Sequence, residues 1–167
     1  RYFFGGYTHY SMAEGKLAAK SSMAGLTTRR DELGAITSTV PGTSIEASDS
    51  SAFEDLLQLQ QPGILSLLDE LRARLQDAEV TWAYGYPIAG DDDSGHDAAI
   101  ALAARADVVL LTLGGKHGTG SIASTGEGVD ATNINLPRCQ EDLIVKLATL
   151  GKPMIGVHLD GRPVSSD

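Results

Sequence analysis

The fold is decided by DVVLLTL, residues 107–113, a run in which only the first residue and Thr112 are polar. A strand that is apolar on both faces is typical of a parallel sheet, because crossover connections place helices against each side of such a sheet. The run ends at Gly114 and Gly115, which begin a long glycine-rich segment. These residues predict a buried parallel strand that is followed by an irregular loop.

The flanking segments alternate between strand and helix patterns. Residue types and apolar spacing predict strands at 80–86, 107–113 and 154–159 and helices at 95–105 and 137–150. Ser94 and Asp97 have the spacing of an N-terminal helix cap. In the first strand, Trp82 and Tyr84 are expected to pack in the core. This order predicts βαβ units and therefore a parallel sheet with helices on both faces.

The first half of the chain has weaker patterning. Apolar spacing predicts helices at 8–25, 51–60 and 63–75. Residues 27–51, rich in Ser, Thr, Gly, Pro and Asp, are expected to form a long loop or a surface insertion, and short extended pieces near Ile36 and Ile45 are compatible with it. No repeat of fixed period and no compositional break divides the chain, so we expect one domain over residues 1–167.

Both ends of the sequence resemble cut ends. The chain starts at Arg1 with RYFFGG instead of Met, and it stops at Asp167 shortly after an expected strand. We therefore expect an excised fragment of an α/β protein, a three-layer α/β/α sandwich with a mostly parallel sheet that is truncated at both ends. Unpaired sheet edges of this kind would favour homodimer contacts.

The composition excludes several classes of partner. The 13 Lys and Arg residues against 22 Asp and Glu residues give a formal charge of −9. Nucleic acids and anionic membranes require clustered cations, so we expect neither as a partner. No apolar run approaches the roughly 20 residues that span a bilayer, and we expect a soluble chain. The one cysteine, Cys139, excludes an internal disulfide and a cysteine-based zinc cluster.

The best place for chemistry is the loop at 114–135. Ligands of open α/β sheets bind at the carboxyl ends of the strands, where the loops at 86–94, 114–135 and 159–165 lie. The middle loop, at about 20 residues, has a length that is usually functional or disordered. Its first half, GGKHGTGS, suggests a phosphate loop, but His117 follows Lys116 where Ser or Thr is required. Nucleotide binding is therefore a minor alternative, and the glycines could simply permit turns.

Two groups of acidic residues could also carry chemistry. Glu127 stands between two glycines, and by residue type alone a solvated loop acid is the simpler interpretation. Asp130 could equally cap a turn. His96 follows the acidic residues 91–93, but contiguous acids before a helix more often match the helix dipole than bind a metal. We therefore expect neither a metal nor a cofactor.

The second half of the sequence resembles a known family. The run DVVLLTLGG is followed by GEGVD at 126–130, LP at 136–137, a Gln–Glu pair at 140–141, GKP at 151–153 and GRP at 161–163. In this order and spacing, these motifs resemble the C-terminal α/β sandwich domain of glycoside hydrolase family 3, the β-glucosidase and β-xylosidase family. The similarity covers about residues 80–167 and is less distinctive over 1–79.

The resemblance implies a two-domain active site. In the family an N-terminal (β/α)8 barrel supplies an Asp nucleophile, and the sandwich domain contributes a loop with the acid/base glutamate. Glu127 is the residue that transfers to this role, in the retaining, exo-acting hydrolysis of a β-glycoside or oligosaccharide substrate without a cofactor. Lys116 and His117 on the same loop are candidate sugar ligands. Ala131 follows Asp130 where Arg is usual, a departure that bears on the hydrogen bonding of the loop.

The acid would act only in the complete site. A general acid near neutral pH needs its pKa raised by burial or by a neighbouring carboxylate, and the barrel would supply both. We therefore expect the 167 residues alone to be inactive. The alternative functions are a non-catalytic carbohydrate-binding or structural module and a nucleotide-binding α/β domain.

Overall fold

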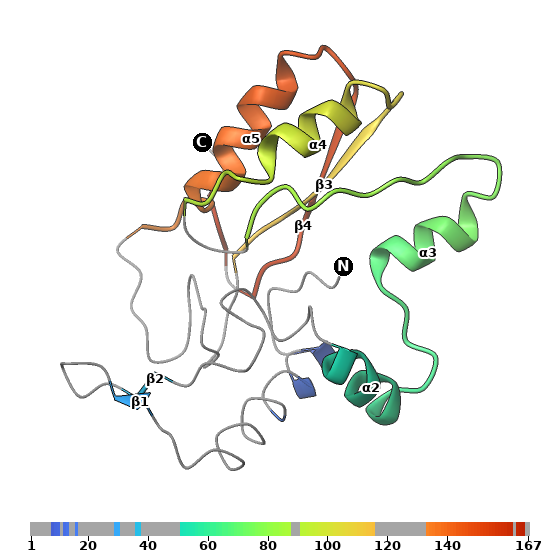
Figure 1. The fold of residues 1–167 in the computed structure, drawn as a ribbon, viewed down its shortest axis with the longest axis vertical. Helices are drawn as coiled ribbons and strands as arrows, with labels where there is room; N and C mark the ends of the chain where they lie inside the picture. Colours follow the sequence, from blue (N-terminus) through green and yellow to red (C-terminus); the bar gives the residue numbers. More distant parts are fainter. Residues whose placement is uncertain are drawn as a thin grey trace.

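The α/β class predicted from the sequence is confirmed. The computed structural model describes residues 8–10, 12–13, 16, 29–30, 36–37, 51–87, 91–115, 133–161 and 163–165. In chain order, the elements labelled in Figure 1 are β1 (Arg29–Arg30), β2 (Ile36–Thr37), α2 (Ser51–Gln60), α3 (Leu67–Arg74), α4 (His96–Ala103), β3 (Val109–Leu113), α5 (Arg138–Ala148) and β4 (Met154–His158). Strands β1 and β2 form an antiparallel pair, whereas β3 and β4 pair in parallel.

The observed elements follow the predicted alternation in the second half of the chain. Helices α4 and α5 and strands β3 and β4 begin and end within about two residues of the predicted bounds, a difference usual for element ends. Helix α2 matches its prediction, and β2 matches the extended piece expected near Ile36. The helix predicted at 8–25 is confirmed at residues 9–10, 12–13 and 16, and Thr8 forms a bend just before it. The other residues of this prediction and the piece near Ile45 lie outside the described residues.

Strands β3 and β4 form the parallel centre of the fold. They pair over five residues each, with Val109 opposite Met154. The pairing continues past the carboxyl end of β3, because the Leu159 N–H donates to Leu113 O at 2.8 Å. The two strands therefore end side by side and form one carboxyl edge.

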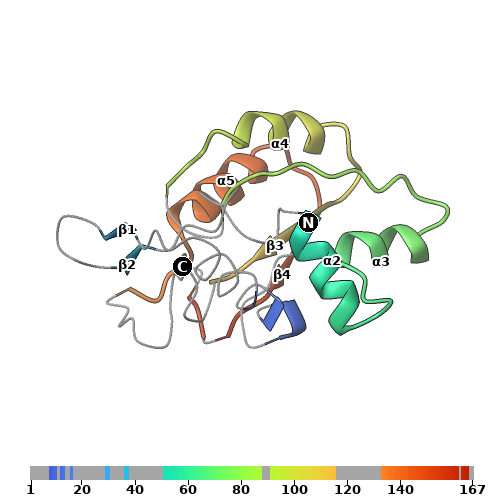
Figure 2. The ribbon, with the colours of Figure 1, turned by 60° about the horizontal axis from the view of Figure 1, so that its bottom comes forward.

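Helices α4 and α5 cover one face of this strand pair (Figures 1 and 2). Ala103 of α4 and Leu143 and Leu147 of α5 are buried there, packed against apolar side chains of the sheet that include Val109, Leu111 and Met154. On the opposite face, Leu110 is 37% exposed and Ile155 is 52% exposed. The coverage of both faces that the sequence predicted is therefore not complete within the described chain, where α4 and α5 share one side.

A second small core joins α2 to the beginning of the chain. Phe53 and Leu57 of α2 are fully buried and pack with Ala13. Helix α3 begins later than predicted because Ser66 is its N-cap and forms a reciprocal capping box with Asp69. Among the described helices, none combines the length and the apolar character needed to cross a membrane.

The strand predicted at 80–86 does not form, so this prediction was wrong. Residues 80–86 have no regular secondary structure and pair with no strand of the described chain. Val80 O accepts a hydrogen bond from Arg72 Nε at 3.1 Å, and the Tyr86 hydroxyl donates to Thr112 O at 3.1 Å. Residue types that favour strands indicate a fit to a half-buried surface and do not by themselves supply a pairing partner.

Tyr84 and Gly85 of this segment lie against the start of α4. A Cβ atom at Gly95 would collide with the carbonyl oxygens of Tyr84 and Gly85, so glycine is required at the N-cap of this helix. Trp82 is 52% exposed and Tyr84 is 38% exposed, so the prediction that both pack in the core was wrong. The last residues of this segment therefore contact the N-terminal end of α4, and its two aromatic side chains are partly exposed to solvent.

Candidate active-site edge

The candidate site is the carboxyl edge of β3 and β4, from which the glycine-rich segment departs. The central residues of this segment, 116–132, lie outside the described residues. The predicted acid/base residue Glu127 and the predicted sugar ligands Lys116 and His117 belong to this part of the chain. What the structure describes is the two attachments of the segment, at 114–115 and at 133–136.

Gln140 of α5 holds the first attachment. Its side chain is fully buried and pairs with both backbone groups of Gly114. Nε2 donates to Gly114 O at 2.8 Å, and Oε1 accepts from the Gly114 N–H at 3.0 Å. An amide side chain presents a donor and an acceptor together, as a backbone strand does. Helix α5 therefore supplies a strand-like partner at the point where β3 ends.

Asp160, just beyond β4, holds the next residue. Its Oδ1 accepts from the Gly115 N–H at 2.8 Å, and its Oδ2 lies 3.3 Å from His158 Nδ1. Gly114 has a φ of +136°, and a Cβ there would lie 2.5 Å from Asp160 Oδ1 and 2.6 Å from Leu159 O. Glycine is the residue that fits this conformation and this space. The backbone therefore leaves β3 in a fixed direction.

The second attachment is made to the chain that follows β4. Asn135 and Ser165 form an isolated parallel bridge. The Ser165 N–H donates to Ile134 O at 2.7 Å, and the Leu136 N–H donates to Ser165 O at 2.8 Å. Both attachments therefore rest partly on residues 159–165, and both ends of the segment are held near the carboxyl edge of the sheet.

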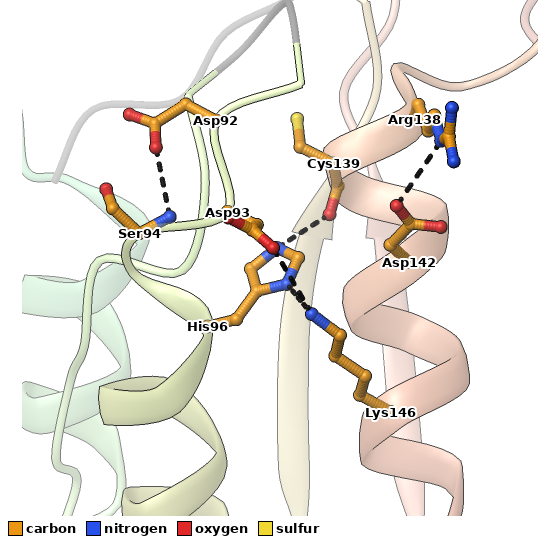
Figure 3. Close-up of polar contacts among 8 residues, drawn as sticks. All are labelled: Asp92, Asp93, Ser94, His96, Arg138, Cys139, Asp142 and Lys146. Carbon is orange, nitrogen blue, oxygen red and sulfur yellow. Dashed lines mark hydrogen bonds and ion pairs between the residues drawn. The ribbon is translucent and has the colours of Figure 1, made fainter.

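A buried histidine joins α4 to α5 (Figure 3). The His96 side chain is 1% exposed; its Nε2 lies 3.0 Å from Cys139 O, and its Nδ1 lies 2.9 Å from Lys146 Nζ. An ammonium group can only donate, so Nδ1 accepts and Nε2 carries the proton in the arrangement that satisfies both contacts. Lys146 also lies 3.6 Å from Asp93. Within the described ranges, no group of three or more His, Cys, Asp or Glu side chains could hold a metal ion.

The acidic residues before α4 stabilise a turn. The N-cap of α4 is Gly95, which makes no side-chain hydrogen bond, so the predicted cap at Ser94 was wrong. Instead the Ser94 N–H donates to Asp92 Oδ1 at 2.9 Å (Figure 3), and this hydrogen bond lowers the pKa of Asp92. A carboxylate readily accepts a hydrogen bond from the backbone N–H two residues further along the chain, and this local turn forms without a helix.

The cysteine at this edge is a poor nucleophile. Burial raises the pKa of the Cys139 thiol to about 11, and Sγ donates to Pro87 O at 3.6 Å. Since the thiolate is the reactive form, the thiol is unreactive at neutral pH. Burial also raises the pKa of Tyr86, whose hydroxyl hydrogen-bonds to the β3 backbone. Both groups therefore act as neutral packing and hydrogen-bonding groups.

Sequence reasoning missed the contacts of Gln140 and Asp160. The sequence marks Gln140 only as half of a Gln–Glu pair, and Asp160 only as a residue in the loop after a strand. The available signal is the place of Gln140 on α5, whose apolar face also carries Cys139 and Leu143. A polar residue on a core-facing side of a helix is expected to find a hydrogen-bond partner, but periodicity does not say which one.

Comparison with known proteins identifies one family. The family model described as the glycosyl hydrolase family 3 C-terminal domain matches residues 15–167. The chain is 32% identical over 105 residues to a beta-xylosidase of Formosa agariphila, across 62% of this chain and 14% of that protein. It is 35% identical over 107 residues to a probable exo-1,4-beta-xylosidase of Aspergillus terreus, across 63% of this chain and 12% of that protein.

A third relative is named for a glucoside and not for a xyloside. The chain is 39% identical over 69 residues to a periplasmic beta-glucosidase of Salmonella typhimurium, across 41% of this chain and 8% of that protein. The chain thus spans at most 14% of the length of these three relatives.

Proposed function

Because the chain belongs to the glycosyl hydrolase family 3 C-terminal domain family, we propose that it is the C-terminal domain of a retaining, exo-acting β-glycosidase that hydrolyses O-glycosidic bonds. The names of the relatives, beta-xylosidase and beta-glucosidase, support this reaction class. Their greater length supports a second part of the proposal, that an N-terminal (β/α)8 barrel completes the active site. In this proposal residues 1–167 act as one domain.

Glu127 is the proposed general acid/base. The observation that carries this role is the attachment of both ends of its segment near the carboxyl edge of β3 and β4, through Gly114–Gly115 and Asn135. In α/β sheets this is the edge at which ligands bind. Sequence similarity at GEGVD, residues 126–130, supports the choice of this carboxylate within the segment.

The proposed chemistry is a double displacement. In the first step the barrel's aspartate attacks the anomeric carbon while the Glu127 carboxyl gives its proton to the departing glycosidic oxygen. In the second step the Glu127 carboxylate takes a proton from water, whose oxygen attacks the anomeric carbon and releases the aspartate. Two inversions give net retention, and this mechanism requires the two carboxyl groups to be about 5 Å apart. Lys116 and His117 would bind sugar hydroxyls beyond the cleaved bond.

The isolated chain is proposed to be inactive. Without a barrel, Glu127 has neither the nucleophile nor the neighbouring carboxylate that would raise its pKa toward neutrality. Detectable hydrolysis of an aryl β-glycoside by the purified 167-residue chain would contradict this part of the proposal.

The test of the function compares the full-length protein with its Glu127→Gln variant on phenyl β-xyloside and phenyl β-glucoside. Loss of a general acid lowers the rate by about 10²–10⁴-fold, and we expect kcat/KM to fall in this range on whichever glycoside the protein hydrolyses. Glu79→Gln makes the same chemical change at an exposed position and is expected to leave kcat/KM unchanged. If Glu127→Gln retains the wild-type rate, the segment has no acid/base role and the chain is a non-catalytic module.

A further inference from the structure

We infer that Gln140 is a positioning residue for the acid/base glutamate, because its buried side chain fixes the backbone at the start of the segment that carries Glu127. This inference rests on the function proposed above. Gln140 would touch neither the sugar nor the reacting atoms; it would act through the backbone of Gly114.

The contact of Gln140 with Gly114 resists displacement for two reasons. Both hydrogen bonds are short, at 2.8 and 3.0 Å, and both are buried, so breaking them would leave polar groups without water. The side chain is also held by its own helix, since Cys139 and Leu143 on either side of it are 1% exposed. Gln140 therefore holds Gly114, at the end of β3, in a fixed position relative to α5.

Asp160 also helps to fix the direction in which the backbone leaves β3. It accepts the N–H of Gly115, the residue after the one that Gln140 binds, at 2.8 Å. Its Oδ1 and the nearby Leu159 carbonyl also leave no room for a side chain at Gly114. Two successive residues are thus bound by one side chain from α5 and one from the loop after β4, and the backbone has little freedom to rotate as it leaves the sheet.

The second attachment, at Asn135, explains why a change at the first attachment, at Gly114, would affect catalysis. The exit at Asn135 is bridged to Ser165, and Gly115 is bound by Asp160, both independently of Gln140. Loss of the Gln140 contacts would therefore release the peptide groups of Gly114 and change the direction of the backbone there, while these neighbouring points stay held. A change of this kind would displace Glu127 relative to the barrel. A misplacement of about 1 Å in a catalytic group lowers the rate by about 10²-fold.

The experiment measures leaving-group dependence in the full-length protein. Phenyl glycosides need a proton on the departing oxygen, whereas 2,4-dinitrophenyl glycosides depart without one, so the ratio of their kcat/KM values reports acid placement. The variants are Gln140→Met, which removes both hydrogen bonds at similar volume, and Glu127→Gly. Leu147→Ala is the matched control, because it weakens the buried core of α5 away from Gly114.

For Gln140→Met we expect kcat/KM on the phenyl glycoside to fall by about 10-fold or more, and kcat/KM on the dinitrophenyl glycoside to change by less than about 2-fold. Leu147→Ala should change the two values by the same factor. Equal losses on both substrates for Gln140→Met would overturn the positioning role. If Glu127→Gly lowers kcat/KM equally on the phenyl and the dinitrophenyl glycoside, the proposed acid/base function itself fails. This outcome differs from equal losses for Gln140→Met, which would overturn only the positioning role.

A second variant keeps the inference testable if Gln140→Met folds poorly. In Gln140→Glu, a protonated carboxyl can donate to Gly114 O and accept from the Gly114 N–H, but a carboxylate can only accept. Burial disfavours a charged carboxylate, so the pKa of a glutamate at this fully buried position should lie well above the ordinary value of about 4.3. The phenyl to dinitrophenyl ratio of Gln140→Glu, relative to that of the wild type at the same pH, should therefore fall as the pH rises from about 5 to about 9. A relative ratio that does not change with pH would contradict the role of the two hydrogen bonds.

Discussion

Replacement of Gln140 by Met is expected to destabilise the chain although the two side chains have similar volumes. In the wild type the amide satisfies the buried N–H and C=O of Gly114, at 3.0 and 2.8 Å. Each buried polar group left unpaired costs about 1–3 kcal/mol, and the gain from a buried apolar side chain offsets about 1–2 kcal/mol of the total. The two groups together cost about 2–6 kcal/mol, so after the offset the free energy of unfolding should fall by about 1–4 kcal/mol.

Urea unfolding of the 167-residue chain, followed by far-ultraviolet circular dichroism, measures this change. Val145→Ala is the matched control on the same helix, because Val145 is 67% exposed and its truncation should alter the free energy by less than about 0.5 kcal/mol. A loss below about 1 kcal/mol for Gln140→Met, at an unchanged denaturant slope, would refute the reasoning. Gly114 would then have found other partners.

Three further perturbations probe the fold around this edge. Gly114→Ala should lower the free energy of unfolding by more than about 2 kcal/mol, since its Cβ would overlap neighbouring atoms. Gly151→Ala, at a φ of +63° with nothing within 4 Å, should cost only about 1 kcal/mol, and equal losses in urea unfolding would contradict the crowding at residue 114. Leu143→Ala empties a site between α4 and α5 that is 1% exposed and should cost about 2–5 kcal/mol; a loss under about 1 kcal/mol in the same assay would mean that this core is loosely packed. Because burial raises the pKa of the Cys139 thiol from 9.0 to about 11, the stability it contributes is complete below pH 9 and is lost as the pH rises toward 11. The urea midpoint should fall over that range more in the wild type than in Cys139→Ala, and rapid reaction of the folded chain with a thiol probe at about pH 7 would contradict the burial.

The alternation of helices and strands in the second half could be predicted because it depends on local pattern. The apolar run at 107–113 became β3, and the helix predicted at 137–150 became α5, whose buried side carries Cys139, Leu143 and Leu147. The strand expected at 80–86 did not form, because a strand needs a partner and residue types do not identify one. The cap expected at Ser94 did not form either, because α4 begins one residue later and has Gly95 as its N-cap.

The candidate site was less accessible to sequence reasoning. Its location at the end of β3 follows from the order of elements, and Glu127 follows from the resemblance to a family. The contact between Gln140 and Gly114 joins residues 26 apart in the chain, and no periodic pattern records such a pairing. The contact of Asp160 with Gly115 spans 45 residues. Both depend on how α5 and β4 pack against β3, which only the folded arrangement defines.

The most direct measurement is the configuration of the product that the full-length Glu127→Gly variant forms in the presence of azide. Without the acid/base residue the glycosyl-enzyme accumulates from an activated substrate, and azide can attack it because azide needs no general base. We predict that azide accelerates turnover of the dinitrophenyl β-glycoside and that nuclear magnetic resonance identifies the product as the β-glycosyl azide. If azide changes neither the rate nor the product, Glu127 is not the acid/base and the segment has another role.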